Sequence, residues 1–192
     1  TGYINVTAAT KTWIARQAVV HLARAFEALG AGVCAGEAEQ KSVTAVYRLP
    51  FCIDRLALCM IVDSAYMGSY PGVNIEVRRS QIPLGDVCGT KNPAIAVFRD
   101  KVNVMGSPHV EAAFAIFTAF MPLFQLLRLD DSETRVCSRE AFAIDMEILS
   151  SAEGRNKHQG VYNAAMARVR RAIDSGFVSR TNDEEDKTDL FI

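Results

Sequence analysis

Basic side chains are the residues of this sequence whose type and spacing most clearly indicate a chemistry. Arg168 and Arg171 are three positions apart, so they are neighbours on a helix, and Arg170 is close to both. A guanidinium group presents a planar fork of N–H donors that matches the oxygens of a phosphate. We therefore predict a groove that binds a nucleic-acid backbone without sequence preference. Its candidate residues are Arg78, Arg79, Arg99, Lys101, Arg155, Lys157, Arg168, Arg170 and Arg171.

A simpler interpretation of these charges remains open. Arg170 can pair with Asp174 one helical turn later, and exposed charges of this kind often only solvate a helix. A GC-rich genome would also raise the Arg content without any selection for phosphate contacts. From the sequence alone, solvated helix charges and a GC-rich genome both remain alternatives to a phosphate-binding groove.

The C-terminal segment is a possible complement to the basic side chains. Residues 181–192 contain five acidic side chains and one lysine, a local charge of −4, while the whole chain carries −1. Residues 1–180 therefore carry +3, because −1 minus −4 is +3. The acidic tail could mask the groove within one molecule or contact a neighbouring copy.

Two motifs with known chemistry are incomplete. The segment His109-Val110-Glu111 resembles the H-x-E of zinc deaminases, but those sites also need a P-C-x-x-C, and Cys137 is the one later cysteine. Gly85 to Lys91 is rich in glycine, yet its lysine does not follow the second glycine of a phosphate loop, and Pro93 disfavours the helix that should start there. We expect neither a metal nor a cofactor.

A cysteine nucleophile would need a lowered thiol pKa and a histidine within hydrogen-bond reach. Cys52 precedes an apolar segment, and His21, His109 and His158 could approach it in the fold. Cys52 and Cys59 also fit small buried apolar residues. An enzyme that holds a small anion with arginine clamps beside a Cys or His is therefore the alternative to a binding protein, and a protein-interaction adaptor is a further alternative.

Two long apolar segments must be buried by the elements that position these groups. Residues 107–129 predict a helix capped by Ser107, begun by Pro108, kinked or divided at Pro122 and apolar almost all round. Residues 51–67 predict a second buried helix, although a turn followed by a buried strand is possible. The alternating stretches within residues 73–105 predict a small β insert.

The remaining pattern predicts three more helices. They cover a segment from Thr10 or Thr12 to Leu29, a segment of residues 138–151 that could also be a strand, and residues 161–175. The predicted fold is mainly α with a small β element (α+β), a single helical domain packed around a central apolar helix at residues 107–129. We expect residues 1–180 to form this domain and residues 181–192 to form an acidic, mobile tail.

Composition is that of a globular protein, with 192 residues of which 49% are hydrophobic and 22% charged. Five cysteines without paired spacing indicate a reducing compartment, and the N-terminal residues do not predict a secretory signal. Glu111 and Arg128 disfavour a membrane helix at the central segment. We expect a cytoplasmic protein, or a virion protein if it is a viral coat subunit.

The resulting hypothesis is a non-enzymatic structural or assembly protein of the nucleoprotein or viral coat type. Its expected partners are copies of itself, in an oligomer or filament, and single-stranded nucleic acid, RNA in particular, with no membrane. No family resemblance supports this hypothesis, which depends on the basic side chains, the acidic tail and the incomplete motifs.

Overall fold

A computed structural model describes residues 6, 11–32, 42–68, 72–77, 92–130, 138–176, 178–180 and 188–190. The chain divides into two compact units, Thr1–Lys41 and Ser42–Ile192. The first unit contains helix α1, Thr12–Ala28, which confirms the helix expected there. Lys11 is its N-cap and makes no side-chain capping hydrogen bond, and Gly30 follows the helix with a φ of 81° that favours glycine.

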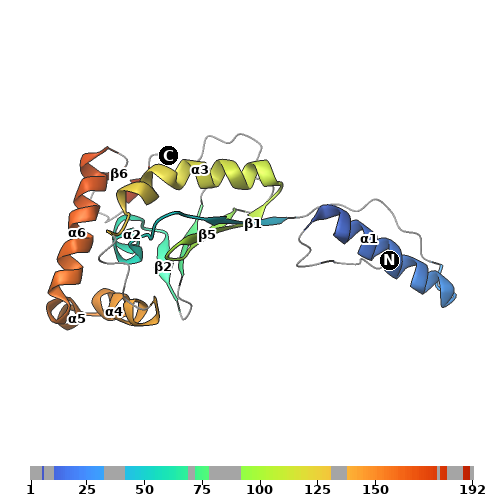
Figure 1. The fold of residues 1–192 in the computed structure, drawn as a ribbon, viewed down its shortest axis with the longest axis horizontal. Helices are drawn as coiled ribbons and strands as arrows, with labels where there is room; N and C mark the ends of the chain where they lie inside the picture. Colours follow the sequence, from blue (N-terminus) through green and yellow to red (C-terminus); the bar gives the residue numbers. More distant parts are fainter. Residues whose placement is uncertain are drawn as a thin grey trace. The chain divides into compact units, whose positions relative to one another are not determined.

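The second unit is built on a five-stranded antiparallel sheet with strand order β1-β5-β4-β3-β2 (Figure 1). Its strands are β1 (Val43–Arg48), β2 (Ala65–Met67), β3 (Val73–Glu76), β4 (Ala94–Val97) and β5 (Lys101–Ser107). The prediction of a helical domain with a small β element is therefore wrong. Strand β1 pairs with β5, although the paired residues Arg48 and Lys101 are 53 positions apart in the sequence. Local periodicity does not reveal such a long-range pairing.

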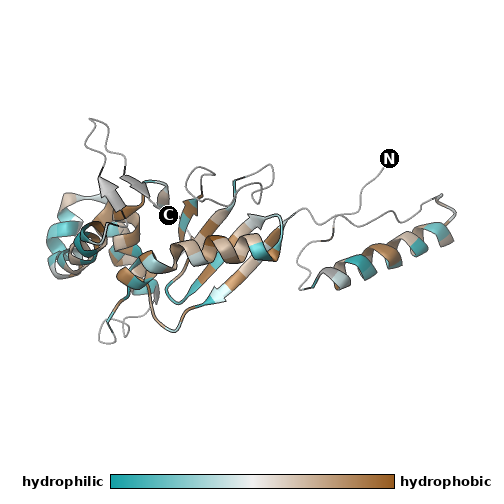
Figure 2. Ribbon diagram, turned by 90° about the horizontal axis from the view of Figure 1, so that it is seen from above, coloured by the Kyte–Doolittle hydropathy of each residue, from teal (hydrophilic) through white to brown (hydrophobic). Residues whose placement is uncertain are grey.

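The helices of this unit lie against one face of the sheet and at one end of it. They are α2 (Arg55–Ile61), α3 (Val110–Leu126), α4 (Ser138–Ser150), α5 (Ala152–Lys157) and α6 (Gln159–Asp174), followed by the paired strands β6 (Val178–Arg180) and β7 (Thr188–Leu190). Figures 1 and 2 show α3 lying along the sheet, while α4, α5 and α6 gather beside α2. The helices expected at residues 138–151 and 161–175 are confirmed as α4 and α6.

Helix α3 is shorter and more exposed than the expected central helix of residues 107–129. Its N-cap is His109, whose Nδ1 accepts a hydrogen bond of 3.2 Å from the backbone N–H of Ala112, whereas Ser107 is the last residue of β5. Pro122 lies within the helix without dividing it. Phe114 is 57% exposed. The helix therefore covers a sheet on one side and contacts solvent on the other.

The segment expected as one buried helix at residues 51–67 contains both α2 and β2. Asp54 caps α2, because its Oδ1 accepts a hydrogen bond of 3.0 Å from the N–H of Ala57. The helix ends at Ile61, and after Val62 the chain turns into the edge strand β2. Strand β2 has only three residues, and so short an alternating pattern in the sequence cannot be distinguished from part of a helix.

The core joins the inner face of the sheet to α2, α3, α4 and α6. The Tyr47 ring of β1 stacks on Phe117 of α3 with 4.1 Å between ring centroids. The largest fully buried side chains are Phe120, Phe124, Ile53, Leu56, Leu58, Ile61, Ile75, Ile95, Ile116, Leu123, Leu127 and Ile148. Among the described helices none is both long and apolar enough to cross a membrane.

Part of the expected domain boundary lies outside the described residues. The residues that the structure does not describe include most of the tail, namely 181–187 and 191–192, and the glycine-rich segment 85–91. The extent of the predicted domain, residues 1–180, and the character of the tail remain predictions.

Candidate functional site

The sheet has a second face, opposite the helices, which we call the open face. Because side chains alternate along each strand, it carries the residues that the core does not use. Figure 2 shows both apolar and polar residues on the sheet; β3 alternates between them, whereas all four residues of β4 are apolar. The open face is formed by Val46, Arg48, Tyr66, Asn74, Glu76, Ala94, Ala96, Phe98, Lys101, Asn103 and Met105.

Strand register aligns the open-face residues in rows that cross the sheet. Val46 pairs with Asn103, Asn103 with Ala96, Ala96 with Asn74, and Asn74 with Tyr66. The two ends of this row are the most exposed, since Tyr66 is 60% and Val46 57% accessible. The row therefore carries two side-chain amides and one exposed aromatic ring, but its centre is less accessible, since Ala96 is 4% exposed and the Oδ1 of Asn103 is buried.

A neighbouring row brings cations and a second ring together. Arg48 lies directly opposite Lys101 in the β1–β5 register. The Lys101 ammonium lies 4.4 Å from the centroid of the Phe98 ring, within the range of a cation–π contact. Among the described residues no carboxylate forms an ion pair with Arg48 or Lys101. This edge of the face is positive, whereas Glu76 lies on β3, toward the other edge.

A separate charged pocket lies where α2, α4 and α6 meet the turn between β4 and β5. Its volume is about 290 Å³. It is lined by Ile53, Asp54, Arg55, Arg99, Leu129, Ala141, Ile144, Asp145, Gly160, Val161, Ala164 and Arg168. Apolar walls and charged groups thus face one small space.

Two buried ion pairs form part of the pocket wall. The Nη1 of Arg168 donates to Oδ2 of Asp54 over 2.8 Å, and its Nε donates to the carbonyl of Arg128 over 3.2 Å. Asp54 also caps α2, so this pair joins α6 to the start of α2. The Nη2 of Arg55 lies 3.3 Å from Oδ2 of Asp145 and joins α2 to α4.

Burial controls the ionisation of two groups near this pocket. Burial raises the pKa of Asp145 to about 6, although the Arg55 guanidinium opposes the shift. Burial, with the negative charge of Asp145, raises the pKa of the Cys59 thiol to about 12. Because a thiolate is the reactive form of cysteine, Cys59 is unsuited to act as a nucleophile.

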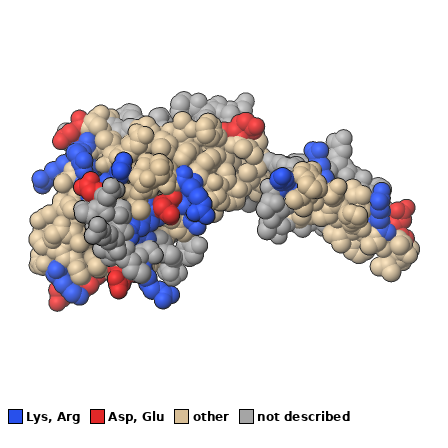
Figure 3. Space-filling model, viewed as in Figure 1, with Lys and Arg blue, Asp and Glu red and all other residues tan. Residues whose placement is uncertain are grey.

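Those sequence-predicted phosphate-binding residues that the structure describes lie on different elements and surfaces. Arg168 is buried, while Arg170 and Arg171 are exposed on the same helix, and Arg155 and Lys157 lie on α5. Figure 3 shows positive and negative side chains intermingled over the α4–α6 end of the molecule. Arg99 and Arg168 line the pocket, Lys101 lies on the open face, and Arg78 and Arg79 lie outside the described residues.

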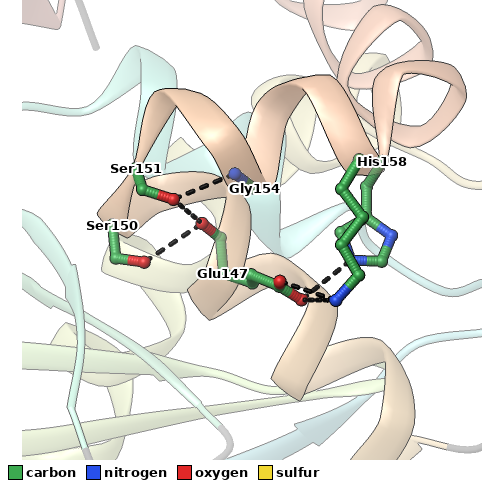
Figure 4. Close-up of polar contacts among 6 residues, drawn as sticks. Glu147, Ser150, Ser151, Gly154 and His158 are labelled. Atoms are coloured by element: carbon green, nitrogen blue, oxygen red, sulfur yellow. Dashed lines mark hydrogen bonds and ion pairs between the residues drawn. The ribbon is translucent and has the colours of Figure 1, made fainter.

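Glu147, Ser151 and His158 form a polar cluster at the corner of α4 and α5 (Figure 4), and Lys157 also contacts Glu147. The Nζ of Lys157 lies 2.7 Å from Oε1 of Glu147, and Nε2 of His158 lies 2.9 Å from Oε2. The hydrogen bond from Lys157, and then that from His158, lower the pKa of Glu147. Ser151 caps α5 by accepting a hydrogen bond of 2.9 Å from Gly154. Lys157 therefore helps to hold a helix corner.

The residues of the incomplete motifs show no catalytic arrangement within the described part of the chain. His109 caps α3, and its Nδ1 lies 3.2 Å from Glu111. Searched over the described residues, the structure holds no group of three or more His, Cys, Asp or Glu side chains that could bind a metal ion. Cys52, His21 and His109 do not line the charged pocket.

Sequence reasoning missed Arg48, Tyr66, Asp54 and Asp145 as site residues. Arg48 is the last residue of β1, and only the register with β5 reveals that it lies beside Lys101. The sequence could have identified Asp54 as a helix N-cap, because aspartate is common at that position and accepts a hydrogen bond from the N–H three residues later, here that of Ala57. Comparison of the chain with family models, curated proteins and solved structures finds no match.

Proposed function

We propose that this protein binds single-stranded nucleic acid, RNA in particular, on the open face of its sheet, as a non-enzymatic structural or assembly protein. The observation that carries the proposal is the arrangement of Arg48, Lys101 and Phe98 in neighbouring rows with the exposed Tyr66. Single-strand binding proteins combine cations that follow the backbone with aromatic rings on which bases stack. The open face supplies both on one flat surface.

A side-chain amide on this face suits RNA without requiring a particular sequence. Asn74 is half-buried, and its amide can donate to or accept from ribose hydroxyls and base edges. Stacking is tolerant of sequence because every base has a π face. Glu76 would repel phosphates, so we place the backbone along the β1–β5 edge.

Two of the other sequence-predicted cations are already bound to carboxylates. Arg168 is buried in its pair with Asp54, and Lys157 is paired with Glu147. A pocket of about 290 Å³ has room for a small molecule and none for a polymer. The open face is therefore the best-supported interface for a nucleic-acid chain.

Helix α1 supports the assembly part of the proposal. Large apolar side chains lie exposed on it and at its C-cap, namely Trp13, Ile14, Val20, Leu22, Phe26 and Leu29. These side chains lie on more than one side of the helix, since Trp13 and Leu22 are nine positions apart, and so many exposed apolar residues favour contact with another protein surface. We propose a second copy as that partner, because Lys11, Arg16 and Arg24 make α1 basic and residues 181–192 carry −4. Light scattering should show oligomers at low salt that disperse as salt rises, and a monomer at every salt concentration would refute self-association.

A fluorescence anisotropy titration with labelled oligouridylate across a salt series tests the nucleic-acid proposal. The double variant Arg48→Gln/Lys101→Gln should bind more weakly, and the negative slope of log K against log salt should become less steep by about 1.4, or about 0.7 for each lost phosphate contact.

The matched control is Arg170→Gln/Arg171→Gln, which removes the same charge from the exposed side of α6. It should leave the slope close to that of the unaltered protein. Absence of binding at low salt, or equal losses in the two double variants, would contradict the open face as the interface.

A further inference from the structure

The two edges of the five-stranded sheet differ in how well they are protected. Edge strand β2 has three residues, whereas edge strand β1 has six and pairs with β5 alone within the described part of the chain. An exposed edge presents unpaired backbone N–H and C=O groups to any other strand, and natural sheets usually shorten, charge or cover it. The β1 edge is long, and Arg48 at its end is its one charged residue.

The ladder with β5 determines which backbone groups of β1 face outward. The N–H of Leu49 donates over 2.9 Å to the carbonyl of Asp100, so the backbone groups of Leu49 point toward β5. Successive residues of a strand direct these groups to opposite sides, and every second residue before Leu49 therefore also faces β5. The residues between them direct their N–H and C=O groups away from the sheet, namely Thr44, Val46 and Arg48.

We propose that the β1 strands of two copies pair antiparallel about a two-fold axis at Val46, which joins two five-stranded sheets into one. In this register Val46, which is 57% exposed, lies opposite Val46 of the second copy, and Arg48 lies opposite Thr44. A parallel pair in register would place two Arg48 side chains side by side, and adjacent like charges are destabilising. Directly opposed residues lie on the same face, so the two open faces become continuous.

Helix α3 extends this contact on the other face of the sheet. It packs on both β1 and β5, so its axis lies above the space between them. With strands about 4.8 Å apart, the α3 helices of two paired copies lie about 10 Å from each other, close to the 8–10 Å of packed helices. Phe114, whose ring lies 6.3 Å from that of Tyr47 on β1, and Val110 are exposed there. A stable dimer needs about 800 Å² from each copy, and these apolar side chains add to what the strand edge supplies.

This contact goes beyond the self-association proposed for α1 and differs from it in its response to salt. Salt screens the attraction between a basic helix and an acidic tail, but it has little effect on backbone hydrogen bonds and apolar contacts. The oligomers expected at low salt should therefore disperse into dimers as salt rises, which light scattering measures. Monomers at high salt, after oligomers at low salt, would refute the edge pairing and leave the α1 proposal standing.

Two substitutions of Val46 test the strand edge at high salt. Val46→Pro removes an outward N–H that the ladder with β5 does not use, so the sheet should fold while the dimer weakens by about tenfold or more. Val46→Thr keeps the N–H and the β-branched shape and should remain dimeric. Circular dichroism checks that each variant is folded. Equal dimer dissociation constants for the two folded variants would contradict pairing through this edge.

Oxidation of introduced cysteines locates the two-fold axis, and it does not depend on the proline variant. In Val46→Cys the two altered residues have Cα atoms about 5.5 Å apart, within the range that a disulfide spans. In the matched control Thr44→Cys, also exposed on β1, they are about 14 Å apart. Both variants keep the five native cysteines, so Val46→Cys alone should give a cross-linked dimer on a non-reducing gel. No cross-link in Val46→Cys, or equal cross-linking in both variants, would overturn the proposal.

Discussion

The open face and the charged pocket use cationic side chains in opposite ways. In the pocket, Arg55 and Arg168 are buried against Asp145 and Asp54, whereas Arg48 and Lys101 on the sheet lie beside each other. A buried charge must be paired, because leaving water costs several kcal/mol for each ion. An exposed charge loses little and remains available for a phosphate. The environment of a cation, more than its presence in the sequence, thus decides what it can do.

The largest expected effect follows from breaking a pocket pair. Arg168→Ala leaves the buried Asp54 without its cation and should lower the free energy of unfolding by about 3–5 kcal/mol. Arg171→Ala, on the exposed side of the same helix, should change it by less than about 0.5 kcal/mol. Urea unfolding of the two variants measures the difference. Equal effects would mean that the two regions do not differ as described.

The next effect concerns Asp145 and pH. Its pKa is raised from 3.8 to about 6 in the folded protein, so the folded state binds the proton more tightly than the unfolded state does. The stabilisation is complete below about pH 4 and is lost as pH rises through about 6, for a loss on the order of 3 kcal/mol from this group. Asp145→Asn should remove this part of the pH dependence of unfolding between pH 4 and 7. An unchanged pH profile in that variant would contradict the raised pKa.

The smallest effect sharpens the description of the open face. Tyr66→Ala should weaken binding of oligouridylate by about 1–2 kcal/mol, because one base loses its stacking partner. The salt dependence should not change, since no phosphate contact is removed. Tyr66→Phe keeps the ring and should bind as the unaltered protein does. A change in salt slope for Tyr66→Ala, or weak binding by Tyr66→Phe, would argue against stacking.

The sequence predicted those elements that local periodicity can specify. The helices α1 and α6 follow from apolar spacing and from a stop at Gly30 or Gly176. Spacing alone left a strand possible for the segment of α4, and its Ala, Glu and Met content favoured the helix. The size of the sheet could not be predicted, because the pairing of β1 with β5 is a contact between distant segments. The apolar composition of α3 indicated burial nearly all round, whereas the sheet covers one side of the helix and Phe114 is 57% exposed.

The candidate site was less accessible to sequence reasoning than the fold. Spacing indicated that Arg168 and Arg171 are neighbours on a helix, but not that only one of them is buried. Ala165 and Ala172 lie one turn before and after Arg168, and their small side chains make room for a guanidinium among buried residues. The partner, Asp54, lies more than a hundred positions away. Such pairs are set by tertiary structure alone.

The corner between α4 and α5 has an evolutionary consequence. A Cβ atom at Gly154 would collide with the backbone carbonyl of Glu147, and the obstacle is backbone that cannot turn aside. No other amino acid fits without moving one helix against the next. Among descendants of this gene, position 154 should therefore stay glycine while surface positions such as Asn156 drift. An invariant residue at that corner would record a steric limit rather than a role in binding.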